Sequence, residues 1–175
     1  MSKSLSMKFF SGFCLGGEEI LFEEYMNHSH FSVAGFSYGA IKALKYALEH
    51  KGRIDKLFLL SPAFYSHTTT EFKQQQLEKF KANPIAYQDK FLSIGNLYGL
   101  NISPYKKLGE LEELEELLSF KWRIEDFDLL LERNIRIEVF LGGKDRVVDV
   151  EQAKQFFSQM GTLFFIKDGD HFLNY

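Results

Sequence analysis

The stretch Gly35-Phe36-Ser37-Tyr38-Gly39 determines how the rest of the chain is interpreted. It stands between an apolar run, 31–36, and an amphipathic segment that begins at Tyr38. This order predicts a strand, a sharp turn and a helix, and a G-x-S-x-G turn in that setting presents a serine hydroxyl at the end of the strand. A side chain on either glycine would collide where strand and helix back onto each other. The sequence therefore predicts a nucleophile elbow with Ser37 at its tip.

Two later loops carry the side chains that such a serine requires. Asp145 follows the apolar run 135–141 and two glycines, and His171 follows a second apolar run that ends at residue 166. A serine hydroxyl is a weak nucleophile at neutral pH, so it needs a base, and the base needs an orienting acid. We therefore expect Ser37 to be the nucleophile, His171 the general base and Asp145 the acid that orients the imidazole.

Acyl transfer also produces an oxyanion, which two N–H groups must stabilise. The residue after the nucleophile, Tyr38, would supply one backbone N–H. The glycine-rich loop after the first strand, 11–17, would supply the other, and we assign it to Phe13. The helix N-terminus behind Ser37 also favours negative charge. The sequence thus predicts an oxyanion hole built from Phe13 and Tyr38.

Other titratable residues have simpler interpretations. Asp149 is a second candidate for the acid, but its position before a predicted helix favours an N-cap. Asp168 and Asp170 flank the histidine and are expected to form its turn. The pair His28 and His30 lacks a third ligand, so we expect no metal site. No cofactor is expected either.

Length and composition exclude several classes of protein. The chain has 175 residues, 45% of them hydrophobic, which suits one domain with its own core. A net charge of −3 gives no sign of nucleic-acid binding. The single cysteine, Cys14, allows no intrachain disulfide and is expected in the core. Without a signal-like N-terminus or an apolar run of about 20 residues, we expect a cytoplasmic protein that does not contact membranes. The oligomeric state stays open.

Strand-like and helix-like segments alternate along the chain, which predicts an α/β fold with about five parallel strands and right-handed connections. The expected strands are 7–10, 30–36, 53–60, 135–141 and 163–166, and the expected helices are 18–26, 38–50, 71–81, 108–120 and 150–160. Residues 1–62 and 135–175 would form the core. Residues 63–134 would form a helical lid inserted after the third strand, over the edge where ligands bind in such sheets.

The predicted lid is divided by charge. Lysines dominate its first half, and glutamates crowd the helix 108–120; the lysines are Lys73, Lys79, Lys81, Lys90, Lys106 and Lys107, and the glutamates are Glu110, Glu112, Glu113, Glu115 and Glu116. The simplest interpretation of both runs is a solvated helix face. A basic docking surface is the alternative.

Four segments together resemble the α/β-hydrolase family over most of the chain. The elbow segment 35–40 matches the family, the segment 142–148 is similar to its acid loop and 169–172 to its histidine loop, and Ser11-Gly12-Phe13 stands where the family has its His-Gly-aromatic oxyanion loop. Ser11 thus replaces the histidine usual in that loop. The strand that the family places between the oxyanion loop and the elbow is missing. The resemblance implies a minimal hydrolase.

Within that family, the size and the helical lid are similar to the short pimeloyl-[acyl-carrier protein] methyl ester esterases of biotin synthesis. This resemblance implies a serine carboxylesterase that removes the methyl group from a carrier-bound acyl chain. The basic part of the lid would then face the acidic carrier protein, with Lys73, Lys79 and Lys81 as candidate docking residues. A thioesterase, an acyltransferase, a small-ester esterase and a non-catalytic binding module remain open alternatives, because one fold hosts many functions.

Overall fold

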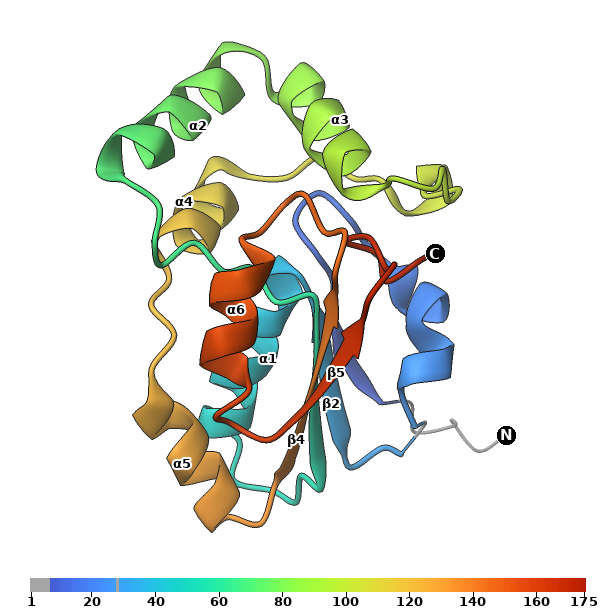
Figure 1. Cartoon of the computed structure of the whole chain (residues 1–175), viewed down its shortest axis with the longest axis vertical. Helices are drawn as coiled ribbons and strands as arrows, with labels where there is room; N and C mark the ends of the chain where they lie inside the picture. Colours follow the sequence, from blue (N-terminus) through green and yellow to red (C-terminus); the bar gives the residue numbers. More distant parts are fainter. Residues whose placement is uncertain (1–6, 28) are drawn as a thin grey trace.

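The computed structural model describes residues 7–27 and 29–175. Within them, five parallel strands form one sheet in the order in which they occur along the chain (Figure 1). The strands are β1 (Lys8–Phe10), β2 (Ser32–Phe36), β3 (Lys56–Leu60), β4 (Arg136–Gly142) and β5 (Thr162–Ile166). The parallel α/β fold expected from the sequence is confirmed.

Burial along the strands follows their position in the sheet. All five residues of β2 are buried, as are four of the five in β3, which explains their continuous apolar sequences. The edge strand β5 leaves Phe164 and Phe165 exposed at 41% and 39%. The buried middle of the sheet therefore gives rise to the elbow, and the more exposed edge strand leads into the histidine loop.

The helices follow the expected order with three additions. They are η1 (Glu18–Tyr25), α1 (Tyr38–Glu49), α2 (Thr70–Ala82), α3 (Pro84–Gly95), η2 (Ser103–Tyr105), α4 (Leu111–Ser119), α5 (Ile124–Glu132) and α6 (Val150–Phe157). The additions are α3, η2 and α5, and the expected helix over 18–26 is a 3-10 helix. Pro84 occupies the first turn of α3, where proline is favoured. The Asn83 side chain caps that helix by accepting a hydrogen bond from the Ala86 N–H.

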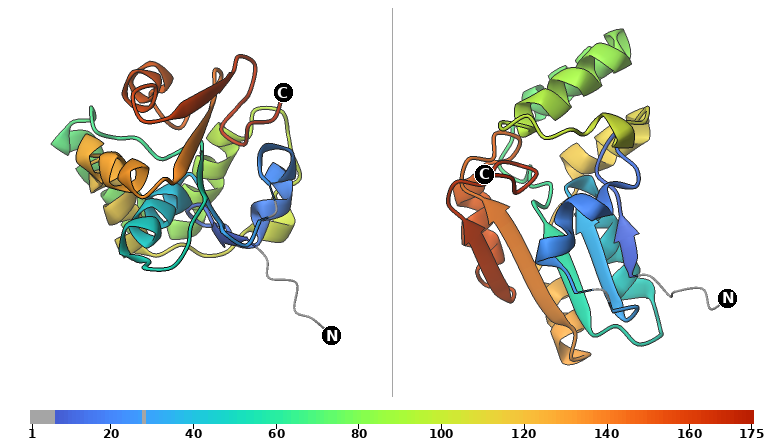
Figure 2. Two further views of the ribbon diagram at one scale, coloured as in Figure 1. Left: turned by 90° about the horizontal axis from the view of Figure 1, so that it is seen from below. Right: turned by 90° about the vertical axis from the view of Figure 1, so that its right-hand side faces the viewer.

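Consecutive residues of β1 show that η1 and α1 cover opposite faces of the sheet. The Phe9 ring packs against Phe22 of η1, whereas the Phe10 ring packs against Tyr46 of α1. Figure 2 shows the two helices on either side of the strands. Parallel strands in sequential order that are joined across opposite faces have connections of opposite hand. The expectation that all connections are right-handed is therefore wrong for this pair.

The segment between β3 and β4 divides into two parts. The helices α2, α3 and α4 lie beyond the carboxyl ends of the strands, whereas α5 packs on the flank of the core against α1 and β4 (Figure 1). Trp122, between α4 and α5, already belongs to the core, because its ring contacts Phe157 of α6 and its Nε1–H donates to the Ala63 carbonyl at 2.8 Å. The lid predicted for 63–134 stays a prediction, and only α2 to α4 are placed to act as one.

The elbow depends on two backbone approaches that no side chain could allow. A Cβ atom at Gly35 would overlap the Gly39 carbonyl oxygen, and one at Gly39 would overlap the Phe10 carbonyl oxygen. Both carbonyl oxygens belong to the backbone, so they cannot move away by a change of rotamer as a flexible side chain could. The two glycines of the motif are therefore a condition for packing α1 against β1 and β2.

We expect Gly35→Ala and Gly39→Ala each to lower the free energy of unfolding by about 1–3 kcal/mol or more, because the new methyl group forces strand and helix apart. Gly16→Ala is the matched control, since a Cβ there would meet only the Lys107 side chain at 3.5 Å. Urea unfolding of the three variants measures the difference. Equal stability of Gly39→Ala and Gly16→Ala would contradict this account.

Candidate active site

Ser37 stands between β2 and α1 in a strained backbone conformation, with φ 54° and ψ −114°. Its N–H donates to the Leu60 carbonyl at 2.9 Å, and its carbonyl accepts from the Ala40 and Ala63 N–H groups, both at 3.1 Å. Strain of this kind costs on the order of 1–3 kcal/mol and persists only where the surroundings fix it. Hydrogen bonds from β3, from the loop after it and from α1 thus hold the serine at the turn.

Three side chains from distant parts of the sequence form one hydrogen-bonded chain. The Ser37 Oγ lies 2.9 Å from His171 Nε2, and His171 Nδ1 lies 2.6 Å from Asp145 Oδ2. All three residues are buried. An ionised carboxylate only accepts hydrogen bonds, so Nδ1 must donate to Asp145, which leaves Nε2 free to accept the serine proton. The arrangement can remove a proton from Ser37 and stabilise the imidazolium that forms.

The Asp145 carboxylate is fixed at both oxygens. Its Oδ1 accepts from the backbone N–H groups of Val147 and Val148, at 2.7 and 3.3 Å, while Oδ2 meets the imidazole. The second acid candidate is occupied elsewhere: Asp149 accepts from the Gln152 N–H and caps α6, as the sequence analysis expects. Asp145 is therefore the carboxylate in contact with His171.

Asp170 has a larger role than the turn formation expected of it. Its Oδ1 accepts from the Phe172 and Asn174 N–H groups, and its Oδ2 accepts from the N–H of Leu97, just beyond α3. Burial raises the pKa of this carboxyl, although backbone hydrogen bonds oppose the shift. Asp170 thus joins the histidine loop to the end of α3. A short aspartate-rich turn gives no sequence signal of a contact 73 residues away.

The predicted oxyanion donors lie on the two loops that flank the serine. Among residues 7–27 and 29–175, neither the Phe13 N–H nor the Tyr38 N–H makes a hydrogen bond to another protein group. Phe13 and Ser37 line the same small pocket. The Tyr38 side chain points away to α4, where its hydroxyl donates to Glu116 Oε2 at 2.6 Å. Their assignment to an oxyanion hole stays a prediction that these free donors support.

The remaining candidates for metal or thiol chemistry have structural explanations. His28 lies outside the described residues, and the His30 ring packs on Phe31, with 3.9 Å between the ring centroids. In the part of the chain that the structure describes, no three His, Cys, Asp or Glu side chains gather as metal ligands would. Cys14 is buried in the core, and burial raises the pKa of its thiol to about 12. The thiol therefore stays protonated at neutral pH.

Two cavities of very different size lie near the serine. A pocket of about 10 Å³ touches Ser37, and a cavity of about 330 Å³ lies beneath α2 and α3. Phe91 lines both. The other residues of the large cavity are mostly apolar: Tyr65, Phe72, Gln76, Lys79, Tyr87, Lys90, Ile94, Leu118, Arg146 and Val147. Phe91 thus lies between a nearly filled site at Ser37 and a much larger cavity with a mainly apolar lining.

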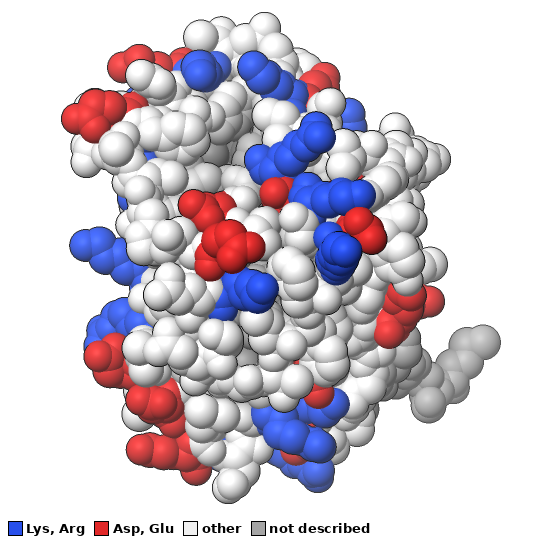
Figure 3. Space-filling model, in the orientation of Figure 1, with Lys and Arg blue, Asp and Glu red and all other residues white. Residues whose placement is uncertain are grey.

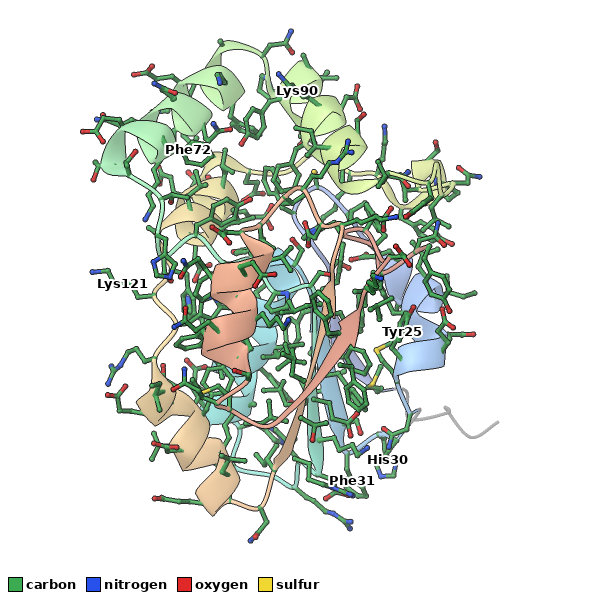
Figure 4. The ribbon with its side chains drawn as sticks, viewed as in Figure 1. Tyr25, His30, Phe31, Phe72, Lys90 and Lys121 are labelled. Atoms are coloured by element: carbon green, nitrogen blue, oxygen red, sulfur yellow. The ribbon has the colours of Figure 1, made fainter. Side chains whose placement is uncertain are left out.

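Cations gather at the large cavity rather than along one face of α2. Its lining includes Lys79, Lys90 and Arg146 and, among the described residues, no carboxylate. Figure 3 shows lysine and arginine side chains beside this hollow, and Figure 4 shows Phe72 and Lys90 on the two helices above it. At about 100° per residue, Lys79 and Lys81 lie about 160° apart around α2. Of the three predicted docking lysines, only Lys79 lines the cavity.

The acidic helix α4 faces α1 rather than solvent alone. Glu113 pairs with Lys42 at 3.3 Å, and Glu116 pairs with Lys45. The Tyr38 hydroxyl bonds to Glu116 as well, and burial raises the pKa of this tyrosine to about 12. The sequence predicts a solvated face for this run of glutamates. Two of them, Glu113 and Glu116, instead connect α4 to α1, the helix that begins at the elbow.

No helix within residues 7–27 and 29–175 is both long and apolar enough to cross a bilayer.

A comparison with protein-family models finds no match. A "Probable 1-acylglycerol-3-phosphate O-acyltransferase" from Oryza sativa subsp. japonica is 34% identical over 88 residues. The matched segment covers 49% of this chain but only 20% of that protein. The likeness is therefore local.

Solved structures match more of the chain. A lipase-esterase related protein from Clostridium acetobutylicum has a TM-score of 0.66 and 12% identity over 95% of this chain and 86% of its own. BioG from Haemophilus influenzae has a TM-score of 0.58 and 10% identity, with coverages of 95% and 88%. An esterase from Exiguobacterium antarcticum has a TM-score of 0.62 and 20% identity, and this chain covers 59% of it. Likeness at these identities shows the fold: the chain has an α/β-hydrolase fold reduced to five strands.

Proposed function

We propose that this protein is a serine hydrolase that cleaves a carboxylic ester. The observation that carries the proposal is the unbroken hydrogen-bonded chain from Ser37 through His171 to Asp145, with distances of 2.9 and 2.6 Å. A buried serine in contact with a base, and a base in contact with an acid, is the arrangement that nucleophilic catalysis requires. Esterases of the same fold, such as the Exiguobacterium antarcticum enzyme, agree with this proposal.

In the proposed mechanism, His171 Nε2 takes the Ser37 proton while Oγ attacks the ester carbonyl. The Phe13 and Tyr38 N–H groups receive the oxyanion of the tetrahedral intermediate. The imidazolium, stabilised by Asp145, then returns the proton to the leaving alkoxide, so that the alcohol departs and an acyl-enzyme remains. A water molecule, activated by the same histidine, repeats these steps and releases the free acid.

For the substrate we propose the methyl ester of a carrier-bound pimeloyl chain, as the resemblance of the sequence to the short pimeloyl-carrier esterases implies; the similar fold of BioG agrees with this choice. The two cavities support this assignment. The pocket at Ser37 holds about one water-sized group. Methoxide is the smallest alkoxide leaving group, so it requires the least widening there. The 330 Å³ cavity beyond Phe91 is lined mainly by apolar residues and suits the acyl chain.

The charge of the large cavity supports a carrier-linked substrate as well. A carrier arm carries a phosphate, and the carrier protein itself is acidic. Lys79, Lys90 and Arg146 line the route that such an arm would follow to Ser37. Opposite charges at this opening would mainly accelerate the encounter between the two proteins. We therefore propose the acyl-carrier protein as the partner, with Lys79 as the best placed of the three candidate docking lysines.

An acyltransferase is the second candidate, because the rice protein with 34% local identity is named a probable acyltransferase. The acyl-enzyme would then react with an alcohol in place of water. Incubation with an activated ester in the presence and absence of glycerol phosphates distinguishes the two reactions. Hydrolysis at an unchanged rate supports the esterase, whereas a new ester product at the expense of free acid supports the transferase.

Ser37→Ala should lower methyl ester hydrolysis by more than about 10³-fold, because the nucleophile is lost. The same variant should lose labelling by a fluorophosphonate, which reacts only with an activated serine. Asp149→Asn is the control, since this carboxylate caps α6 outside the hydrogen-bonded chain. Release of methanol from the carrier-linked ester measures activity. Activity retained in Ser37→Ala would remove the serine from the mechanism.

Reversing charge at the cavity with Lys79→Glu and Lys90→Glu should lower kcat/KM for the carrier-linked ester by about tenfold at low ionic strength, with the difference fading near 1 M salt. Hydrolysis of a small neutral ester should change by less than about twofold, because it needs no docking. Lys121→Glu makes the matched control, since this exposed lysine between α4 and α5 does not line the cavity. Equal losses on both substrates would refute the docking assignment.

Phe91→Ala should join the two cavities, because this ring lines both. We expect kcat/KM to rise for bulky acyl esters relative to acetate esters. Ile94→Ala serves as the control, because this side chain lines only the large cavity. The ratio of octanoate to acetate hydrolysis for the two variants is the measurement. An unchanged ratio in Phe91→Ala would show that substrates reach Ser37 by another route.

A further inference from the structure

Glu18, the first residue of η1, is a buried acid outside the proposed proton-transfer chain. Its side chain has no exposed surface. Its Oε1 accepts the Gly12 N–H at 2.7 Å, while Oε2 has no hydrogen-bond partner among the described residues. The Ser11 hydroxyl lies close enough to influence the carboxyl, yet no hydrogen bond of normal geometry reaches Oε2. A carboxyl buried with one oxygen unsatisfied costs stability, so stability alone does not explain its presence.

The group that Glu18 holds is adjacent to the predicted oxyanion donor. Gly12 precedes Phe13, and its N–H belongs to the peptide plane next to the one that carries the Phe13 N–H, the two planes meeting at the Gly12 Cα. The Gly12 carbonyl shares the peptide plane of the Phe13 N–H and is also fixed, because it accepts the Leu15 N–H at 3.2 Å. On its other side, a Cβ at Gly12 would lie 2.8 Å from the Phe36 ring. The loop is thus held by contacts on three sides, and Glu18 supplies the one to its N–H.

We propose that Glu18 is a positioning residue for the oxyanion hole, holding Gly12 so that the following N–H, that of Phe13, points at the oxygen of the tetrahedral intermediate. The inference rests on the proposed serine-hydrolase function and adds a residue to its site. An N–H must already be aimed when charge develops, because a donor that has to reorient contributes less to the transition state. A rigid anchor behind the loop meets that requirement.

The proposed anchor also explains how the loop is supported without the histidine of the resembled family, whose place Ser11 takes. Glu18, seven residues along the chain, reaches the same loop from η1 and bonds to its backbone directly. Burial raises the pKa of the Glu18 carboxyl, and the Gly12 hydrogen bond opposes that shift. In its protonated form the carboxyl still accepts from Gly12 through its carbonyl oxygen. It then adds no negative charge behind a site that must receive an oxyanion.

Glu18→Met tests the proposal, because methionine keeps the volume and removes the acceptor. We expect kcat for p-nitrophenyl acetate to fall by about 10- to 100-fold, less than the loss of a complete oxyanion donor, with KM changed by less than about threefold. The melting temperature should change by less than about 4 °C, because the removal of a buried unsatisfied oxygen offsets the cost of leaving the Gly12 N–H without an acceptor. Glu18→Gln retains an acceptor and should stay within about threefold of wild-type kcat. Glu19→Ala, an exposed neighbour on η1, is the matched control.

Labelling of Ser37 by a fluorophosphonate separates this inference from the proposed function. If the wild-type protein labels and folded Glu18→Met labels at the same rate, the positioning role is wrong. If the wild-type protein does not label, the hydrolase proposal fails. Amide hydrogen exchange of residues 11–15 then decides the anchoring itself: faster exchange in Glu18→Met than in Glu19→Ala supports it, and equal exchange overturns it. Should Glu18→Met not fold, Glu18→Ala below its melting temperature gives the same comparisons.

Discussion

The close approach of backbone to backbone at the elbow is the constraint on which the structure depends. Gly39 lies against the Phe10 carbonyl, and Gly35 lies against the Gly39 carbonyl. The backbone of α1 therefore packs directly on the backbones of β1 and β2, with no side chain between helix and strands. That contact forces the chain through a strained turn at Ser37, and hydrogen bonds to Leu60 and Ala63 keep the turn in place. The strain is stored in the part of the sheet that is most completely buried, where the surroundings can hold it.

The remaining parts of the site come from neighbouring strand ends. Parallel strands in sequential order bring the loops after β1, β2, β4 and β5 to one edge, so residues as far apart as Ser37 and His171 come within hydrogen-bonding distance. Asp170 then ties the histidine loop to the end of α3, and the Tyr38 hydroxyl ties the elbow helix to α4. Hydrogen bonds thereby connect α3 and α4, which lie above the site, to the segments that carry the proposed base and the proposed nucleophile.

A reduced sheet changes how the proposed oxyanion loop must be supported. Where the related fold inserts a further strand, this chain passes from β1 to β2 through η1, which covers the face opposite α1. This path accounts for the opposite hands of two successive connections. It also brings the start of η1, and with it Glu18, directly behind Gly12. The shortened topology and the proposed anchor of the oxyanion loop are therefore consequences of the same chain path.

Periodicity and the G-x-S-x-G turn are local signals, so the strands, most helices and the side chains Ser37, Asp145 and His171 could be predicted before the fold was known. The sequence could also have revealed α3, since Asn83 and Pro84 form an ordinary helix start. The face that η1 covers, the lysine that lines the cavity and the group that Glu18 holds could be learned from the folded chain alone. Those facts depend on contacts between segments distant along the chain, and neither periodicity nor residue spacing encodes which surfaces meet once the chain has folded.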